Sequence, residues 1–235
     1  MLDTDPSAVV LVIPVLNEAE TIAGVVCAVP RNVIGEIIVV DGGSHDETAD
    51  RAKAAGARVL IEPNAGYGAA CHVGAQAASP ECRIIAFIDG DGSDDPNELG
   101  RIVGPLLANK ADFVIGSRVR GQREAGSMGS HQLLAGHLAG LATYLLYGVR
   151  YTDMCPLRAI RRDALNTLDM RERRYGWNLE MQMRAARAGL RILELPVRHR
   201  HRSGGRSKVA GSFKGTLKAS WQLATTFIRI AAASR

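Results

Sequence analysis

The stretch FIDGDGSDDP, residues 87–96, places four aspartates among glycines directly after the apolar run 84–88. An apolar run of this length that ends at once in polar residues predicts a buried strand. Asp89 and Asp91 are separated by one residue, so in an extended chain their side chains point the same way. Four carboxylates this close repel one another unless a cation, a helix N-terminus or water takes up their charge.

A calcium loop of the EF-hand type does not fit this stretch. A loop that starts at Asp89 needs glycine at its sixth position and glutamate at its twelfth, where this chain has Asp94 and Gly100. Asp89 and Asp91 instead suit Mg²⁺ or Mn²⁺ bridged to a diphosphate, since Mg²⁺ usually takes one or two carboxylates and completes its shell with phosphate oxygens and water. Asp94 and Asp95 precede a proline and are expected to cap a helix. The alternative is that all four aspartates only form turns and caps.

Strands and helices alternate through the first half of the chain. Strands are predicted at 9–13, 36–40, 58–61, 83–88 and 113–115, with helices ending near 29, starting at 46, and covering 68–78 and 96–107. This alternation predicts an α/β fold with a mostly parallel sheet flanked by helices. Such sheets bind ligands at the carboxyl ends of their strands. The polar clusters at 17–18, 41–44 and 89–95 all follow predicted strands, so we expect them to meet there.

The second half predicts helices at 130–147, 176–188 and 213–230 and a strand at 191–197. The last helix carries an apolar stripe beside basic residues, so it either lies on a membrane surface or packs on the domain. Before it, RHRHRSGGRSK (198–208) is basic and broken by glycines, which predicts a loop. A loop that closes over phosphates explains this composition better than a nucleic-acid patch, because few aromatic residues accompany it to stack on bases.

Composition limits the classes of function. The chain has 235 residues, of which 46% are hydrophobic and 23% charged, as in ordinary globular proteins. A net charge of +5 favours anionic partners such as nucleotides, phosphates or membrane surfaces. The N-terminus lacks the pattern of a signal peptide, and the uncharged stretch 132–149 is a poor membrane span. We therefore expect a cytoplasmic protein that is at most peripheral on the inner face of the cell membrane.

A dinucleotide-binding unit of the NAD type is not predicted, because PVLNE (14–18) stands after the first strand in place of G-x-G-x-x-G. Taken in order, PVLNE, VVDGGSHDET (39–48), NAGYGAA (64–70), FIDGDGSDDP and IGSR (115–118) resemble the nucleotide-sugar domain of family 2, GT-A-fold glycosyltransferases. Downstream, TDMCPLRAIRR (152–162), Glu180, ELPV (194–197) and the spacing R-x-x-G-x-S-K at 202–208 resemble dolichyl- or polyprenyl-phosphate mannose and glucose synthases. The resemblance spans roughly residues 8–215.

This resemblance implies a Rossmann-like GT-A catalytic domain over residues 1–210. Its nucleotide-sugar half would lie at about 8–120 and its acceptor half at about 121–210, followed by an amphipathic helix at 211–235. The implied reaction moves a hexose from a donor of the GDP-mannose or UDP-glucose type to a polyprenyl phosphate, with inversion and with Mg²⁺ or Mn²⁺ as cofactor. The two transmembrane hairpins that some relatives append are missing from this sequence.

The resemblance also implies roles for individual residues. Nucleotide-sugar binding is expected at Pro14, Leu16, Asn17, Glu18, Val39, Asp41, Gly90 and Arg118, and metal binding at Asp89 and Asp91. Acceptor or phosphate binding is expected at His131, Arg158, Arg202, Ser207 and Lys208. The chain departs from the family pattern at Cys155-Pro156-Leu157-Arg158, where Ser-Gly-Phe-Arg is usual, at Ser93 in place of glutamine, and at His131 in place of arginine.

The chemistry of the acceptor decides whether the reaction needs a carboxylate as general base. A lipid phosphate is already anionic and needs positioning rather than a general base. A hydroxyl acceptor needs a base, for which Glu180 is the first candidate and Asp94 or Asp95 the next. Three functions therefore stay open: a polyprenyl-phosphate glycosyltransferase, a related glycosyltransferase with a soluble hydroxyl acceptor, and a non-catalytic nucleotide- or nucleic-acid-binding protein.

Overall fold

The computed structural model describes residues 5–64, 66–204 and 213–232, and at 131 and 213–222 it describes the backbone alone. Its strands are β1 (Val9–Val15), β2 (Glu36–Asp41), β3 (Arg58–Ile61), β4 (Ile84–Phe87), β5 (Phe113–Ser117), β6 (Arg158–Arg161) and β7 (Ile192–Pro196). Its α-helices are α1 (Ile22–Ala28), α2 (Thr48–Ala54), α3 (Tyr67–Ala77), α4 (Leu99–Leu107), α5 (Ser130–Tyr147), α6 (Arg162–Thr167), α7 (Trp177–Arg187) and α8 (Phe213–Ala232). Short 3₁₀ helices lie at η1 (Pro6–Ala8) and η2 (Pro96–Glu98).

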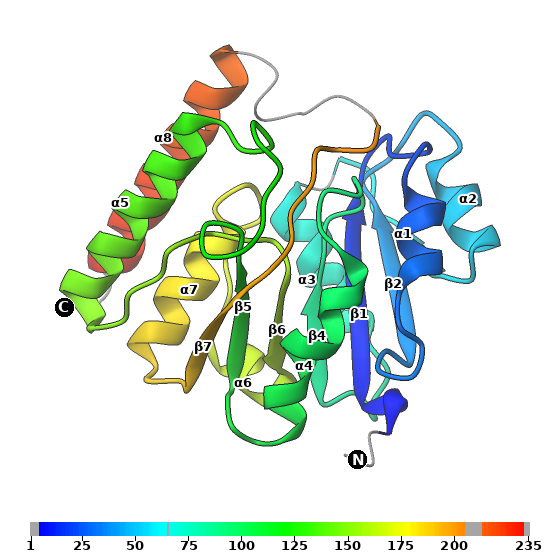
Figure 1. Ribbon diagram of the computed structural model, residues 1–235, viewed down its shortest axis with the longest axis horizontal. Helices are drawn as coiled ribbons and strands as arrows, with labels where there is room; N and C mark the ends of the chain where they lie inside the picture. The colour runs from blue at the N-terminus through cyan, green and yellow to red at the C-terminus, as the bar shows by residue number, and fades with distance from the viewer. Residues whose placement is uncertain (1–4, 65, 205–212, 233–235) are drawn as a thin grey trace.

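The strands form one sheet in the order β3-β2-β1-β4-β6-β5-β7, with helices on both sides (Figure 1). β1 pairs in parallel with β2 and β4, and β5 pairs in parallel with β7. β6 runs antiparallel to both of its neighbours, β4 and β5. The predicted α/β fold with a mostly parallel sheet is confirmed. The sequence did not predict β6 or α6, because RAIR is short and half arginine.

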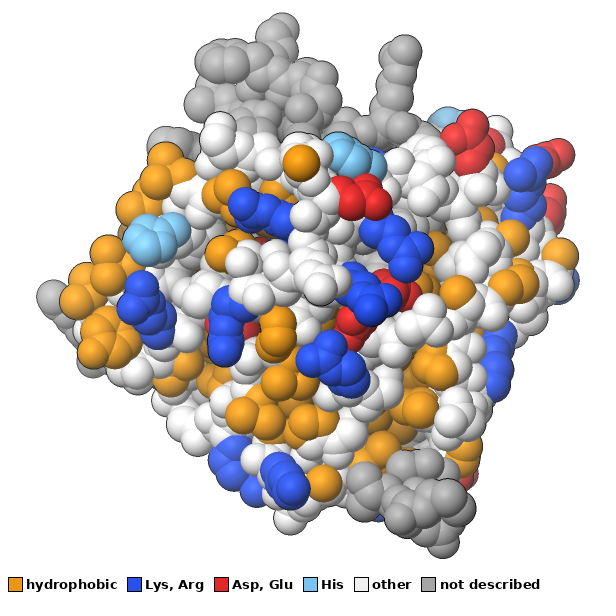
Figure 2. Space-filling model, viewed as in Figure 1, with side chains coloured by type: hydrophobic (Ala, Val, Ile, Leu, Met, Phe, Trp, Pro, Cys, Tyr) orange, Lys and Arg blue, Asp and Glu red, His pale blue; other side chains and the backbone are white. Residues whose placement is uncertain are grey.

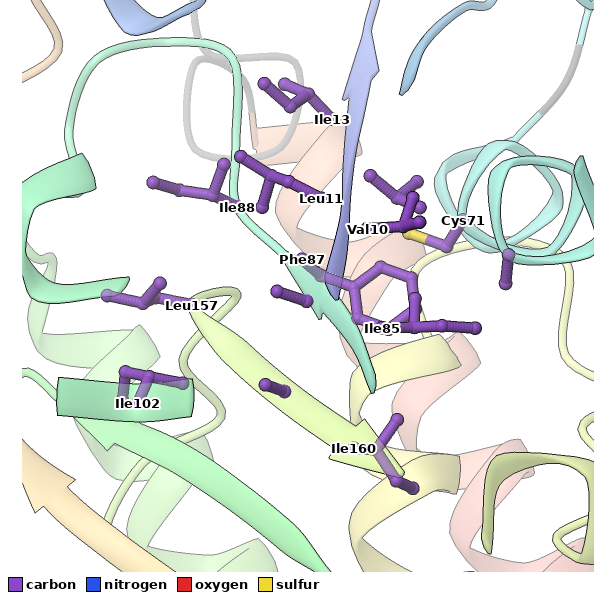
Figure 3. Packing of buried hydrophobic residues seen from close by; sticks show 14 of the residues in the cluster. Val10, Leu11, Ile13, Cys71, Ile85, Phe87, Ile88, Ile102, Leu157 and Ile160 are labelled. Carbon is purple, nitrogen blue, oxygen red and sulfur yellow. The ribbon is translucent and has the colours of Figure 1, made fainter. Parts of the chain in front are cut away.

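The central strand β1 is buried along its whole length, as expected for a parallel strand with helices on both faces. Val12 contacts Gly74 of α3, where an added Cβ would meet both of its methyl groups. Ile13 and Val15 point the other way and meet Ile22 of α1 beneath Gly90. Because side chains alternate along a strand, α1 and α3 cover opposite faces of the sheet. The core residues around β1 and β4 are shown in Figure 3.

The C-terminal helix packs on the domain through α7. Leu179 and Met183 of α7 form a small apolar cluster with Ile230 of α8, and Ala139 and Tyr147 of α5 pack against it. In Figure 1, α5 and α8 both lie at the edge of the molecule farthest from α2. Of the apolar stripe predicted on this helix, Ala224 and Ile228 fall among the residues whose side chains are described, and both are exposed. Within the described residues, no helix is both long and apolar enough to span a bilayer.

Candidate functional site

A cleft of about 1010 Å³ opens where β1, β2 and β4 end. Its walls come from segments at or just after the ends of these strands, at 14–18, 42–45 and 89–93, and from the distant segment 199–202. The clusters that the sequence placed at strand ends therefore meet at one edge of the sheet. Figure 2, which views the sheet from the side, shows Asp and Glu side chains lying among Lys and Arg side chains near the middle of the molecule.

The structure brings together most of the predicted site residues. Those that line the cleft are Pro14, Leu16, Asn17, Glu18, Asp89, Gly90, Asp91, Arg118 and Arg202. Val39, Asp41, Arg158 and Glu180 do not line it and are all buried. Ser207, Lys208 and the side chain of His131 lie outside the described residues.

Asp89 carries the clearest sign of a ligand. Its Oδ1 is shielded from solvent and has no hydrogen-bond partner among the described residues. Burial, followed by the negative charges of Asp91 and Asp94, raises the pKa of Asp89 well above its usual value. A carboxylate oxygen shielded from water without a partner is unfavourable, and a cation beside it would offset both this cost and the repulsion from Asp91 and Asp94. This environment fits a divalent cation.

Asp91 is held from both sides. Its Oδ1 accepts a hydrogen bond from the backbone N–H of Ser93 at 2.9 Å, and its Oδ2 lies 3.1 Å from the guanidinium of Arg202. Among the described residues, no three His, Cys, Asp or Glu side chains are close enough to hold a metal by themselves. Asp89 and Asp91 therefore fit an ion of the Mg²⁺ type, which relies on phosphate and water for its remaining ligands.

The basic segment 198–204, which belongs to the loop predicted to close over phosphates, lies against the acidic stretch 91–95. His199 Nδ1 lies 3.3 Å from Asp94, and Arg200 pairs with Asp95 at 3.0 Å. The backbone N–H of Arg200 donates to the carbonyl of Ser93, and that of Ser203 donates to the carbonyl of Asp91. Asp95 also caps η2 through the N–H of Asn97, as predicted, whereas Asp94 caps no helix and pairs with His199 instead.

Asp41 shapes the cleft without lining it. Its Oδ1 accepts hydrogen bonds from the N–H groups of Gly43 and Ser44 and from the Ser44 hydroxyl. The loop it holds contributes Gly42, Gly43 and His45 to the wall. Val39 lies in the middle of β2 and is wholly buried. Val39 and Asp41, expected to bind the nucleotide, therefore lie behind the cleft wall, which at this point is formed by the loop after β2.

Arg118 reaches the cleft from the end of β5. Its guanidinium makes two bonds to Asp153, of 2.8 and 2.7 Å, and its backbone N–H makes a third. Burial favours the neutral guanidine, but the bonds to Asp153 outweigh it and raise the pKa of Arg118. The same pair lowers the pKa of Asp153 despite its burial. Arg118 is therefore a fixed positive charge at the cleft wall.

Arg158, predicted to bind the acceptor, is placed elsewhere. It is wholly buried in β6, where its guanidinium donates to the carbonyls of Cys155 and Asn178 and stands 5.9 Å from the centre of the Phe113 ring. Burial lowers the pKa of Arg158. The geometry supports a structural role, because this side chain ties β6 to the start of α7.

Glu180 is also enclosed. Its Oε2 accepts from the backbone N–H groups of Arg171 at 3.0 Å and Glu172 at 2.6 Å. Its Oε1 accepts from Nε of Arg184 at 2.9 Å, and its side chain is 0% exposed. The expectation of a general base at Glu180 has no support in this geometry, since the carboxylate faces a loop and a neighbouring helical turn.

Several lining residues had been given no role from the sequence; they are His45, Asn64, Tyr67, Ser127, Gln132, Arg174 and Tyr175. A signal existed for Asn64 and Tyr67, which belong to the motif NAGYGAA. Tyr67 begins α3 close to Asp89, and burial followed by that charge raises its pKa. Arg174 and Tyr175 come from the loop between α6 and α7, and no sequence pattern marks them.

Comparison with known proteins gives consistent matches. Residues 10–169 match the family model described as glycosyl transferase family 2. The chain is 38% identical over 214 residues to an uncharacterized glycosyltransferase of Mycobacterium tuberculosis, covering 89% of this chain and 93% of the relative. It is 30% identical over 226 residues to the undecaprenyl-phosphate mannosyltransferase of Micrococcus luteus, covering 88% and 89%.

Solved structures with a similar fold include a sugar-transferring enzyme of known ligands. Glucosyl-3-phosphoglycerate synthase from Mycobacterium tuberculosis, in complex with Mn²⁺, UDP-glucose and phosphoglyceric acid, superposes with a TM-score of 0.78 at 25% sequence identity. The match covers 96% of this chain and 80% of that one.

Proposed function

This chain belongs to glycosyl transferase family 2, and from that membership we propose that it transfers a hexose from a nucleoside-diphosphate sugar to a polyprenyl phosphate. An oxygen of the acceptor phosphate would form the new bond to the anomeric carbon. The bond from that carbon to the donor diphosphate would break on the opposite side, which inverts the configuration. Family membership favours an enzyme over the non-catalytic alternative.

The position of Glu180 is the observation that favours an anionic acceptor over a hydroxyl acceptor. A hydroxyl acceptor needs a base within hydrogen-bond reach, yet Glu180 is enclosed by backbone N–H groups and Arg184. The two carboxylates considered next do not line the cleft: Asp94 Oδ1 lies against His199, and Asp95 is bonded to Asn97 and Arg200. A phosphate acceptor arrives ionised and needs no such base, so this arrangement supports an anionic acceptor.

The donor would lie across the carboxyl ends of β1, β2 and β4. Pro14, Leu16 and the loop 42–45 would contact the nucleoside, and Asp89 and Asp91 would hold Mg²⁺ or Mn²⁺ beside the diphosphate. The ion would supply positive charge to the departing diphosphate. Arg202, which already lies at this position, would contribute a second positive charge from the chain itself.

A small phosphate-bearing acceptor is the second candidate, because the similar solved structure contains phosphoglyceric acid. In that case sugar would pass to a hydroxyl, and a base would have to come from outside the three carboxylates considered above. Both candidates share a phosphate group on the acceptor, and they differ in the atom that attacks.

A peripheral position on a membrane would suit the lipid acceptor. Leu134, Leu138, Leu141 and Leu145 form one exposed stripe on α5, each between 44% and 74% exposed. No Asp or Glu occurs from residue 125 to 152, and Arg150 at the end of the stripe is exposed. Figure 2 shows hydrophobic side chains at this edge. These features favour an anionic lipid surface.

The stripe also adjoins the cleft, because Ser127, Met128 and Gly129 line the cleft directly before α5 begins. A lipid whose phosphate enters the cleft could thus lay its hydrocarbon chain along the exposed face of α5.

A paired experiment tests the proposal. Melting temperature is measured with UDP or GDP, with and without Mn²⁺, since a ligand that binds only the folded state raises stability. Transfer is then measured from labelled UDP-glucose and GDP-mannose to a polyprenyl phosphate and, separately, to 3-phosphoglycerate. We expect one nucleotide to stabilise the protein in the presence of Mn²⁺ and label to enter the lipid. Label in phosphoglycerate alone would support the second candidate and contradict the first.

A further inference from the structure

We infer that Arg174 binds the phosphate of the acceptor, and that two side chains of α8 keep Arg174 in place through Glu172. This inference rests on the proposed function, because it assumes an acceptor that carries a phosphate. The phosphate could belong to a lipid or to a small metabolite, and the chemistry of recognition is the same for both.

Among the arginines that the structure describes along the cleft, Arg174 is the one whose guanidinium is left available. Arg118 is bound to Asp153, Arg200 to Asp95, and Arg202 to Glu18 and Asp91. The guanidinium of Arg174 makes no hydrogen bond or ion pair with the residues that the structure describes, and its side chain is exposed. An arginine held at a cleft wall with its donors open suits an incoming phosphate.

The loop that carries Arg174 is held by two carboxylates. Glu180 accepts the backbone N–H groups of Arg171 and Glu172. Glu172 Oε1 accepts those of Arg173 at 3.1 Å and Arg174 at 2.9 Å. Four successive backbone donors are thereby fixed, which is unusual for a loop on the surface. The backbone from which the Arg174 side chain extends is therefore well defined.

The opposite edge of this loop is fixed to the start of α3. The carbonyls of Arg173 and Arg174 accept from the N–H groups of Ala69 at 2.9 Å and Gly68 at 3.2 Å. Gly66 and Gly68 leave no room for a Cβ against the loop backbone. Since α3 begins beside Asp89, this contact brings Arg174 and Tyr175 to the cleft wall.

The link to α8 passes through the second oxygen of Glu172. Oε2 accepts from the hydroxyl of Thr226 at 2.9 Å and from Arg229 at 3.2 Å. Thr226 is buried, and a Cβ on Gly176 would meet its hydroxyl. Thr226 and Arg229 do not line the cleft, so they would act as positioning residues for the loop.

Arg174 and Arg202 both line the cleft, and they belong to segments that pack on opposite faces of the sheet. Arg202 contacts Glu18, just before α1, whereas the loop of Arg174 packs on α3. α1 and α3 cover opposite faces, as the alternation along β1 shows. With Arg202 on the side of Asp91, where the donor diphosphate is proposed, Arg174 would face the second substrate.

The test separates donor from acceptor. Arg174→Gln is compared with Arg174→Lys and with Arg31→Gln, which removes an exposed arginine outside the cleft. Calorimetric titrations measure binding of UDP or GDP with Mn²⁺, then binding of farnesyl phosphate, 3-phosphoglycerate or inorganic phosphate to that complex. Transfer assays give the KM for each acceptor.

We expect Arg174→Gln to weaken phosphate-probe binding and raise the acceptor KM roughly 10- to 100-fold, with nucleotide affinity unchanged. Arg174→Lys should lose less, and Arg31→Gln should match the wild type. The probe that is affected identifies the source of the phosphate. Unchanged probe binding in Arg174→Gln, an equal loss of nucleotide affinity, or no probe binding by the wild type would overturn the inference. Probe binding without transfer would instead refute the proposed function and leave the site standing.

The positioning role has its own variants. Thr226→Val removes the hydroxyl that reaches Glu172, and Thr226→Ser keeps it. We expect the acceptor KM to rise several-fold in Thr226→Val, with donor KM unchanged, and to recover in Thr226→Ser. A fall in kcat with both KM values unchanged, or no recovery with serine, would contradict the role of α8.

Discussion

The guanidinium of Arg202 lies 3.1 Å from the Asp91 carboxylate, one of the two carboxylates proposed to hold a divalent cation. The same guanidinium lies 2.7 Å from Glu18, which precedes it by 184 residues in the chain. An arginine and a cation at the same carboxylate oxygen repel each other and compete for it. Arg202 therefore competes with the cation for Asp91. A bound diphosphate would relieve this competition, because its oxygens can accept hydrogen bonds from the Arg202 guanidinium in place of the Asp91 carboxylate.

Replacement of Arg202 tests this competition. We expect Arg202→Gln to bind Mn²⁺ alone several-fold more tightly than the wild type, because Asp91 loses its positive partner. Nucleotide binding in the presence of Mn²⁺ should weaken, because a phosphate contact is lost. Electron paramagnetic resonance titration of free Mn²⁺ measures the first effect. Arg200→Gln, whose partner is Asp95, serves as the control, and weaker Mn²⁺ binding in Arg202→Gln would contradict the competition.

Asp91→Asn should remove metal-dependent nucleotide binding without unfolding the protein. In the wild type, nucleotide at a hundred times its Kd should add about 2.7 kcal/mol of stability. In the variant this gain should vanish when Mn²⁺ is present, while the melting temperature of the free protein stays close to that of the wild type. Asp95→Asn provides a comparison within the same acidic stretch. Full metal-dependent stabilisation of Asp91→Asn would refute the assignment.

Glu180→Gln should act on stability. The amide has one acceptor oxygen in place of two and brings donors toward the N–H groups of Arg171 and Glu172. Loss of such buried bonds is unfavourable by about 1–3 kcal/mol, and we expect a clear fall in melting temperature. At a temperature where the variant is folded, kcat should fall far less than a lost general base requires, about 100-fold or more. A stable variant without turnover would restore the base role.

The pair of Asp112 and Arg191 predicts a dependence of stability on pH. Its bonds, of 2.7 and 2.9 Å, tie the segment before β5 to the start of β7. The side-chain bonds from Arg191 lower the pKa of Asp112 from 3.8 to about 2. A carboxyl group whose pKa is lower in the folded state than in the unfolded state stabilises the fold at pH values above its unfolded-state pKa. This contribution is lost as the pH falls through its folded-state pKa. Asp112→Asn should therefore melt lower than the wild type at pH 7, and the difference should shrink between pH 4 and 2. A constant difference across that range would contradict the assignment.

The exposed stripe of α5 predicts binding to anionic vesicles. Leu141→Glu with Leu145→Glu places two negative charges on it, and we expect sedimentation with phosphatidylglycerol vesicles to fall sharply. Ile61→Glu, at an exposed apolar position on β3, is the control. If the wild type does not bind vesicles but the double variant converts a dimer to a monomer in size-exclusion chromatography, the stripe is an interface between copies of the chain.

The local pattern of the sequence was enough to predict most strands and helices of this protein. The alternation of apolar runs and helices predicted β1 to β5, β7 and the helices around them, because periodicity depends on neighbours along the chain. Asp89, Asp91 and Glu18 could be placed at one edge from sequence, because parallel strands bring their carboxyl ends together. The basic segment could be assigned to the same region only through its resemblance to a family.

Tertiary structure decided the rest. Arg158 and Glu180 look like site residues in the sequence, yet each is satisfied by backbone groups in the interior. Arg174 has no motif, and it reaches the cleft because a loop is fixed between α3 and α8. The fold decides which charged side chains come close enough to pair, as it does for Glu18 and Arg202, which lie far apart in the sequence. The sequence by itself determines where strands end and which charges are present, whereas burial and long-range pairing determine which of those charges can meet a substrate.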